Sequence, residues 1–340
     1  MTRKRAFLLF GIGMAVLLIV GFVVGAIGSK MFGLGSSFLP EPGIHLAPDP
    51  VFPASVRDSV VGYRVADKKT DDHGEAQTTD SAEGDHGKEE EHHGLGLMQF
   101  AVTNTLLSAW LTSIVMLVLF ISAGRKPKAI PTRLQALVEI MFEAVLNFSA
   151  SVLGPEMGRR VFPVVATIFF FVLFNAWIAI FLIPIYQAVG YGAYDETLGQ
   201  FKLATHLIRP AGTDVNMPLA LALISFVFVE YWGFRAHSFG YLKKFFAFGE
   251  LRKGPAGLIG VFVGILELLS ELVRVVSFTF RLFGNMTAGE ILVVMFTFLV
   301  PFVATQFVFG LELLVGLVQA VIFAGLTLVF LSVAVSHEEH

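Results

Sequence analysis

Several ionisable side chains interrupt an apolar stretch near the end of this 340-residue chain. Residues 258–335 are nearly all hydrophobic, yet they contain Glu267, Glu271, Arg274, Arg281, Glu290 and Glu312, together with Asn285 and Gln319. An ionised side chain at the centre of a bilayer costs at least about 2.5–3.5 kcal/mol on insertion scales. Such residues usually mark an ion path, a proton relay or a mutual ion pair. This stretch is therefore the first place to look for chemistry.

Helical spacing arranges these charges around one arginine. At about 100° per residue, one helix face carries Glu267, Glu271, Arg274, Phe278, Arg281 and Asn285. Glu290 comes nine residues after Arg281, so it points to the opposite side, about 13.5 Å further along the axis. Glu312 and Gln319 are seven residues apart and share a face of the following helix.

Carboxylates on both sides of a fixed arginine suit a proton path in two halves, with the arginine as the barrier between them. Carboxyl groups accept and release protons. Arg281 keeps its proton in practice, so it cannot relay one. It can attract a carboxylate on a partner, hold that group ionised, and block a direct leak between two half-paths.

Structural alternatives stand beside this interpretation for the other charged residues. Glu271 and Arg274 could pair or extend toward the membrane surface, and Glu267 has the same alternative. For Glu312 and Gln319 the alternative is a hydrogen bond between helices without a transport role. These structural alternatives explain Arg281 least well, because it is far from both ends of the apolar stretch and so cannot easily reach the membrane surface.

Composition places these residues in an integral membrane protein. The chain is 55% hydrophobic and 15% charged, where soluble domains carry roughly a quarter charged residues. Its mean hydropathy is +0.73. The absence of cysteine excludes disulfides, thiol catalysis and cysteine-based zinc sites. There is no basic stripe of the kind that binds nucleic acid.

Apolar runs of the length needed to cross a membrane, about 20 residues, recur along the chain. We expect spans at residues 7–27, 99–122, 161–186 and 217–234, and a hairpin of two long helices over 258–335 that breaks around Gly289 and Pro301. Residues 134–153 carry Glu139 and Glu143 one turn apart and predict an amphipathic helix at the membrane surface. The predicted fold class is an all-α integral membrane protein with five to six membrane helices plus this interfacial helix.

Three regions divide the chain. Residues 1–30 begin with Arg3, Lys4 and Arg5, and they form an apolar segment that is either a retained anchor or a signal peptide cleaved near Ala26 and Gly28. Residues 31–97 form a polar extracytoplasmic region. Residues 98–340 form the membrane domain, with the hairpin at 256–336. Basic loops at 125–133 and 235–253 place those loops and the C-terminus in the cytoplasm.

The polar region contains an acidic, histidine-rich tract at residues 66–94, which we expect to be disordered. Four histidines in it could in principle hold a metal: His73, His86, His92 and His93. A solvated acidic tract is the favoured interpretation, because no ligand pair is set at a fixed spacing in a predicted helix. No metal site is therefore predicted.

A resemblance enters with the residues around the central arginine. Residues 281–290, Arg-Leu-Phe-Gly-Asn-Met-Thr-Ala-Gly-Glu, resemble the signature of the F-type ATP synthase a subunit, the ATPase subunit 6 family of the Fo proton channel. Residues 317–323 resemble that family's last helix, and residues 213–223 resemble its fourth segment. Asn104, Thr105 and Asn175 are also polar where the family is polar. The resemblance extends from about residue 95 to 337.

The resemblance implies a role for each matching residue. Arg281 resembles the arginine that faces the carboxylates of the rotating c-ring, with Asn285 and Gln319 as its polar neighbours. Glu290 and Glu312 resemble residues that line the half-channel from the outside. Glu267 and Ser277 resemble members of the cytoplasmic half-channel. The last two helices would then be long, tilted and wrapped against the ring.

One part of the family pattern is missing. The family often has an aspartate a few residues after the Asn175 position, but Ile178, Ile180 and Leu182 are apolar here. Glu230 is a carboxyl that could serve elsewhere. The outer entry route for protons therefore differs from the family pattern.

The resulting hypothesis is a stator a subunit that couples proton flow to ring rotation and ATP synthesis. Its implied partners are the c-ring, the b subunit and the other synthase subunits, in a bacterial inner membrane. No P-loop is present, so we expect a non-catalytic subunit that needs no cofactor. The alternatives are a secondary ion/proton antiporter, which predicts repeats and broken helices, and a membrane anchor whose charges serve assembly.

Overall fold

A computed structural model describes residues 3–32, 48–53, 57, 101–125, 131–186, 189–195, 200–237, 241 and 255–336. Its helices are α1 (Arg3–Val24), α2 (Ala26–Met31), α4 (Asn104–Gly124), α5 (Arg133–Leu153), α6 (Pro155–Tyr186), α7 (Asn216–His237), α9 (Pro255–Leu299) and α10 (Val303–Val335). Strand β1 (Pro50–Phe52) pairs antiparallel with β2 (Val102–Thr103), and β3 (Gly190–Asp195) with β4 (Gln200–His206). A short 3-10 helix, η1 (Ala211–Thr213), precedes α7. The histidine-rich tract lies outside the described residues.

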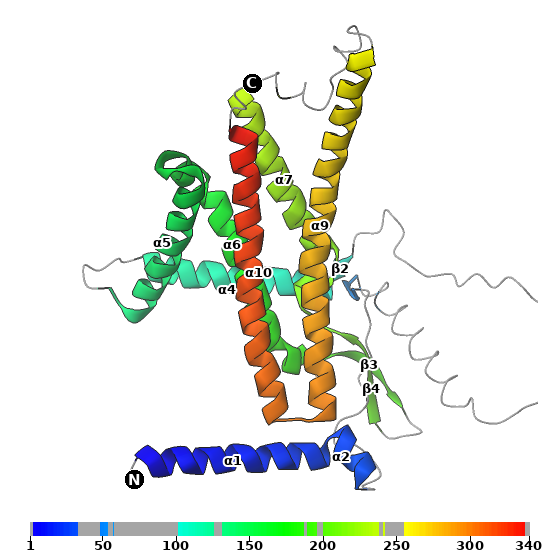
Figure 1. Ribbon diagram of the computed structural model, residues 1–340. Coiled ribbons are helices and arrows are strands. Elements are labelled where there is room, and N and C mark those ends of the chain that lie inside the picture. Colours follow the sequence, from blue (N-terminus) through cyan, green and yellow to red (C-terminus); the bar gives the residue numbers. More distant parts are fainter. Residues whose placement is uncertain are drawn as a thin grey trace, which may run out of the picture.

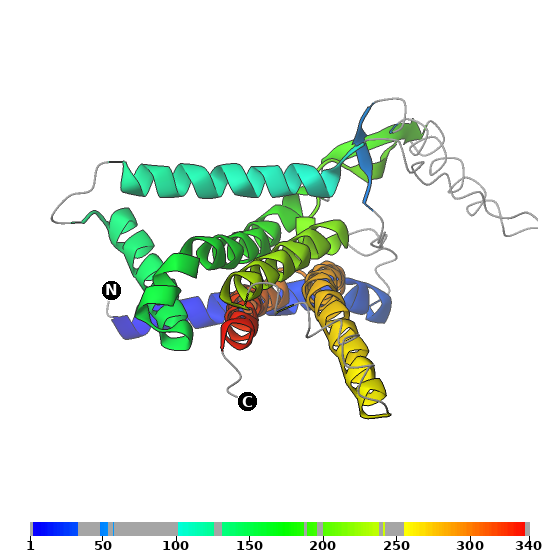
Figure 2. The ribbon, with the colours of Figure 1, turned by 90° about the horizontal axis from the view of Figure 1, so that it is seen from above.

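Two long antiparallel helices, α9 and α10, dominate the molecule, and α1 and α4 lie across them (Figure 1). In both views α1 and α4 run along the same direction with opposite polarity (Figure 2). At 1.5 Å per residue, α9 is about 67 Å long and α10 about 50 Å. Both exceed the hydrocarbon thickness of about 30 Å, so neither helix fits upright within the membrane core.

Helix α6 is the centre of the packing. Of its apolar stretch 56% is buried, against 17% for α4 and α5. One apolar cluster joins α5, α6, α7 and α10 around Val165, Phe170 and Leu328. A second joins α6, α7, α9 and α10 around Leu173 and Phe323. The hairpin is thus held against the rest of the bundle mainly through α6 and α7.

Helix α4 buries polar side chains and exposes apolar ones, which is the opposite of a helix in a soluble protein. It buries Asn104, Thr105, Ser108 and Thr112, which repeat with helical spacing, and it exposes large apolar side chains such as Trp110, Ile114 and Val118. Hydrocarbon is as apolar as leucine, so small and polar side chains mediate contacts between membrane helices. The exposed apolar face is therefore a lipid-facing surface.

Within the described chain, five helices are long and apolar enough to cross a membrane by length and composition: α4, α5, α6, α7 and α10. This confirms the predicted class, a multi-pass all-α membrane protein. Helix α5 meets the same criterion although its sequence is amphipathic, so its position at the membrane surface stays a prediction.

The structure corrects one prediction about the hairpin and adds detail to another segment. The expected break around Gly289 was wrong, because α9 continues through this residue to Leu299. The chain turns only at residues 300–302, where Phe302 has a positive φ of 73°. The segment at 187–216 was predicted as a loop, and it contains the β3–β4 hairpin and η1.

Candidate functional site

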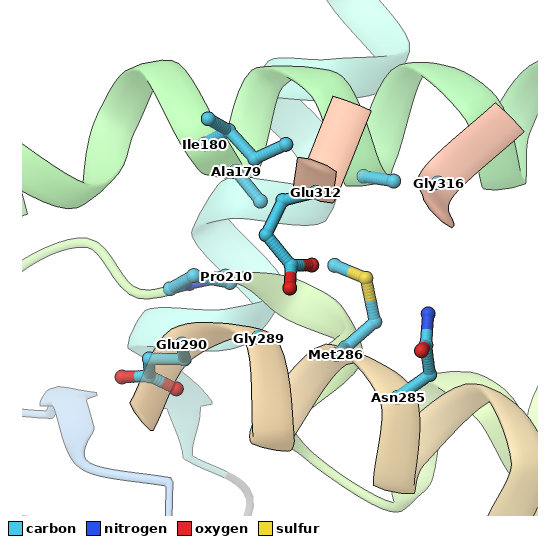
Figure 3. A pocket seen from close by; sticks show the side chains of 10 residues that line it. Ala179, Ile180, Pro210, Asn285, Met286, Gly289, Glu290, Glu312 and Gly316 are labelled. Carbon is cyan, nitrogen blue, oxygen red and sulfur yellow. The ribbon is translucent and has the colours of Figure 1, made fainter. Parts of the chain in front are cut away.

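A small, mostly apolar cavity with three polar lining residues lies where α6, α9 and α10 meet the segment before η1. Its volume is about 340 Å³, part of it open to solvent. Figure 3 shows the lining residues, which are Ala176, Ala179 and Ile180 from α6, Pro210, then Asn285, Met286, Gly289 and Glu290 from α9, and Glu312 and Gly316 from α10. Three residues that the sequence singled out, Asn285, Glu290 and Glu312, are therefore brought together here.

The carboxylate of Glu312 points into the cavity (Figure 3). It lies directly against the Cα of Gly289, where a Cβ would come within 2.7 Å of the Glu312 carboxyl carbon. No hydrogen bond or ion pair to Glu312 forms among the described residues. Gly289 is thus a helical glycine whose missing side chain makes room for a carboxylate.

Glu290 is bound to an arginine that the sequence did not point to. Arg209 Nη2 lies 3.1 Å from Glu290 Oε2, and its Nε donates to Oε1 at 3.2 Å. Only 5% of the Arg209 side chain and 10% of the Glu290 side chain are exposed. The Glu290 carboxylate points away from that of Glu312 (Figure 3). The two carboxylates therefore have different surroundings. Glu290 is held by an ion pair with Arg209, whereas Glu312 has no hydrogen-bond or ion-pair partner among the described residues.

A buried polar network holds the segment that carries Arg209. Thr105 Oγ1 donates to Asp214 Oδ2 at 2.9 Å, and the Asn104 side chain donates to the His206 carbonyl at 3.2 Å. Asp214 also accepts from the Asn216 backbone and side-chain amides at 3.1 and 2.9 Å. Asn104 and Thr105 thus tie the start of α4 to both ends of this segment.

Arg281 lies outside the cavity, on an exposed strip of α9. Its side chain is exposed, and so are Ser277 before it and Gly284 and Ala288 after it, which lie on the same face at helical spacing. Among the residues that the structure describes, no carboxylate pairs with Arg281. The flanking side chains are small, so another helix could approach the guanidinium closely.

Gln319 lies on the inner face of α10, where 6% of it is exposed. Its Nε2 has no hydrogen-bond partner in the described part of the chain, and the same is true of Asn175 Nδ2 on α6. Buried amides without partners are uncommon in native structures. Both side chains are thus donors held in place inside the bundle without a protein acceptor.

Glu267 and the residues near it lie further along α9, toward its N-terminal end. Glu267 is half-buried. Glu271 is buried and forms an ion pair with Arg274 at 2.5 Å, and the Arg274 guanidinium lies 3.8 Å from the centroid of the Phe330 ring. The pairing alternative considered for Glu271 and Arg274 is therefore confirmed.

The structure thus separates the predicted residues into three places. Asn285, Glu290 and Glu312 share the cavity, Arg281 and Ser277 lie on the exposed strip, and the remaining two are elsewhere on the hairpin. Arg209 was missed because its partner is 81 residues away in sequence. The Arg-Pro-Ala-Gly sequence at 209–212 carried no signal of that contact.

Fold and site together define a class of protein, a multi-pass helical membrane protein with carboxylates buried between two unusually long helices. Comparison with known proteins gives the family. The family model described as ATP synthase A chain matches residues 106–332. A subunit a of ATP synthase from Sulfurihydrogenibium sp. (strain YO3AOP1) is 34% identical over 227 residues, 67% of this chain and 94% of the relative.

Other relatives match in the same way. ATP synthase subunit a of Aquifex aeolicus (strain VF5) is 30% identical over 239 residues, which is 68% of this chain and 96% of the relative. That of Geobacter sp. (strain M21) is 29% identical over 245 residues, 72% of this chain and 93% of the relative. The chain belongs to the ATP synthase A chain family, and it is a membrane subunit of an ATP synthase complex.

Proposed function

We propose that this chain forms two proton half-channels against a rotating ring of c subunits and so couples proton flow to ATP synthesis. The observation that carries the proposal is Arg281. It is exposed in the middle of an apolar hairpin, without an acidic partner among the described residues. A charge of this kind in hydrocarbon costs at least about 2.5–3.5 kcal/mol. A carboxylate on a neighbouring protein would remove that cost.

The cavity supports an outer half-channel. Glu312 is a free carboxyl that can take a proton from an aqueous entrance and pass it on. Glu290 is held by Arg209, so its charge is fixed beside the path rather than moved along it. Asn285 lies on α9 one turn from Arg281 and also lines the cavity, and thus lies between the outer carboxylates and the arginine.

Glu267 and Ser277 support the inner half-channel. Ser277 is exposed one turn before Arg281, on the strip that would face the ring. Glu267 is about 21 Å from Arg281 along the axis, in the direction of the N-terminal end of α9. The neighbouring Glu271 is held by Arg274 and is thereby a structural member of this region.

In this mechanism a proton enters past Glu290 and Glu312 and neutralises a ring carboxylate. The ring turns, and the proton leaves near Glu267 toward the cytoplasm. Arg281 ionises each arriving carboxylate and prevents a direct leak. The chain would act in a bacterial inner membrane with its C-terminus in the cytoplasm, beside the c-ring, the b subunit and the remaining synthase subunits, and it would not bind nucleotide itself.

The antiporter hypothesis finds less support. It predicts broken helices around a site at the membrane midplane, but α9 and α10 each run without a break on their side of the 300–302 turn. The anchor hypothesis differs from the proposal in its prediction for a variant, because an anchor would keep its function when Arg281 is lost.

The test is ATP-driven proton pumping in inverted membrane vesicles that carry Arg281→Ala, with assembly of the complex checked. We expect pumping to disappear while the complex still assembles. The control is Arg160→Ala, because Arg160 is an exposed arginine whose ion pair with Glu156 is solvent-accessible on both sides, and exposed pairs contribute little. Pumping near the wild-type level in Arg281→Ala would overturn the proposal and reopen the other two hypotheses.

A further inference from the structure

The N-terminal helix α1 lies outside the region that the chain shares with its family. The family match begins at residue 106, and the relatives are matched over nearly their whole length. Helix α1 is thus an addition to the common subunit. At 22 residues it is about 33 Å long, close to the hydrocarbon thickness of about 30 Å.

Helix α1 has the direction of a membrane crossing. It runs antiparallel to α4, one of the five candidate spans, in both views (Figures 1 and 2). Its N-terminus therefore lies at the same end of the molecule as the C-terminus of α4. Both ends are basic, with Arg3–Arg5 at one and Arg125 following the other, as the positive-inside rule requires of cytoplasmic ends.

Two glycines, Gly21 in α1 and Gly25 directly after its C-terminal end, contact the turn of the α9–α10 hairpin. Gly21 and Gly25 are one helical turn apart, and both are buried. A Cβ at Gly21 would collide with the carbonyl group of Pro301, and one at Gly25 with that of Leu299. Only glycine lets the helix backbone approach the turn this closely. By contrast, residues 11–20 of α1 are all exposed.

The turn has a conformation that needs support. Phe302 has φ 73° and ψ −103°, and such a backbone costs on the order of 1–3 kcal/mol and persists only where its surroundings hold it. Pro301 is buried beneath α1. Ala26 and Gly28, the small residues that a signal peptidase would have to reach, are buried inside α2.

We infer that α1 is retained in the mature subunit as an additional membrane-spanning helix that clamps the outer turn of the α9–α10 hairpin through Gly21 and Gly25. The clamp fixes the end of the hairpin nearest the cavity, beyond Glu290 on α9 and before Glu312 on α10. Retention and packing do not depend on the proposed proton path. Only the effect on pumping rests on it.

The first test is the N-terminus of the subunit in the complex purified from membranes, read by intact mass and N-terminal sequencing. We expect a chain that begins at residue 1 or 2. A chain that begins between residues 25 and 31 would overturn the inference, whatever the pumping data for Arg281 show.

The second test compares a glycine pair at the C-terminal end of α1 with a pair in its middle. Gly21→Ala with Gly25→Ala adds two Cβ atoms against the turn, whereas Gly11→Ala with Gly13→Ala adds them where nothing lies within 4 Å. Alanine favours a helix over glycine, so the second pair should leave the complex unchanged or slightly more stable. We expect the first pair to lower the melting temperature of the purified complex, because overpacking a tight contact is destabilising. We also expect it to lower ATP-driven pumping about tenfold, because a displaced turn would shift the groups that line the cavity.

If the two pairs of variants gave the same pumping and the same melting temperature, the inference that Gly21 and Gly25 hold the hairpin turn would be overturned. Should the first pair prevent accumulation of the complex, the single variants Gly21→Ala and Gly11→Ala give the same comparison at half the added volume. An Arg281→Ala subunit that still pumps would refute the proposed function but would leave the mass and melting measurements valid as tests of the clamp.

Discussion

At the scale of single residues, the site consists of side chains that are either clamped or free. Glu290 and Glu271 are each held by an arginine, whereas Glu312 and Arg281 have no charged partner among the described residues. Groups that move protons or meet a moving partner must be able to change partners. This division supports our proposal, in which Glu290 and Glu271 have structural roles and Glu312 and Arg281 act in transport.

Arg209→Ala tests the clamp on Glu290. The change leaves a carboxylate buried without its partner, which for a buried pair costs about 3 kcal/mol or more. We expect a clear fall in the melting temperature of the complex and a loss of pumping. Arg209→Ala combined with Glu290→Gln should recover part of the stability, because the double variant buries no unpaired charge. A double variant less stable than Arg209→Ala would contradict this role.

Gly289→Ala tests the space that Glu312 needs. The added Cβ would lie within 3.0 Å of both the carboxyl carbon and Oε1 of Glu312, so the carboxylate must move. Small misplacements of reacting groups are costly, and we expect proton pumping to fall about tenfold with assembly intact. Gly310→Ala, on the same hairpin, is the matched control, since a Cβ added at Gly310 would meet no other part of the described chain within 4 Å. Unchanged pumping in Gly289→Ala would mean that the position of Glu312 is not critical.

At the scale of elements, helix ends are held by residues outside the helices. Tyr241 is buried beside the C-terminal end of α7, where it packs against Gly233 and its hydroxyl donates to Glu230 Oε1 at 3.4 Å. Burial, together with the negative charges of Glu230 and Glu271, raises the pKa of the Tyr241 phenol above its ordinary value of 10.0. The neutral phenol is therefore part of the folded structure.

This pKa shift predicts a loss of stability at alkaline pH. A raised pKa contributes stability that is present in full below pH 10 and falls as pH rises above it, because the unfolded chain ionises first. Tyr241→Phe should lower stability at pH 8 by about 1 kcal/mol through the lost hydrogen bond and should weaken the decline between pH 10 and 11. Tyr231→Phe removes only an exposed hydrogen bond from Arg235, so it should change stability little and leave the alkaline decline as it is in thermal melts. The same alkaline decline in Tyr241→Phe and wild type would exclude this tyrosine as its cause.

At the scale of the whole molecule, the surface is apolar and the interior carries the polar contacts. Large exposed side chains cover the outer faces of α4, α7, α9 and α10, among them Ile114, Val227, Phe262 and Phe307. Between helices lie contacts such as the hydrogen bond of Ser225 with Thr327 at 2.8 Å. This arrangement is stable only in lipid. The strip around Arg281 departs from this rule, and it is where we expect the ring.

Much of the fold could be predicted from local sequence patterns. Runs of about 20 apolar residues predict spans. The ends of α4, α6 and α7 lie close to the predicted ones, although α4 starts at Asn104 instead of residue 99 and α6 at Pro155 instead of residue 161. The buried charges of the hairpin predict a functional region, and the helical period places Glu290 on the side opposite Arg281. These properties depend on residues that are close in sequence, so a pattern is enough to reveal them.

The partners of those charges are a property of the tertiary structure alone. Arg209 meets Glu290 across 81 residues, Glu312 occupies the space that Gly289 leaves open, and Gly21 lies against Pro301 at the far end of the chain. The sequence by itself determined that this is a membrane protein with a charged helical hairpin. Only the packed structure decided which charges are clamped and which are free, because a contact between distant segments depends on how whole helices pack and leaves no periodic pattern in either segment.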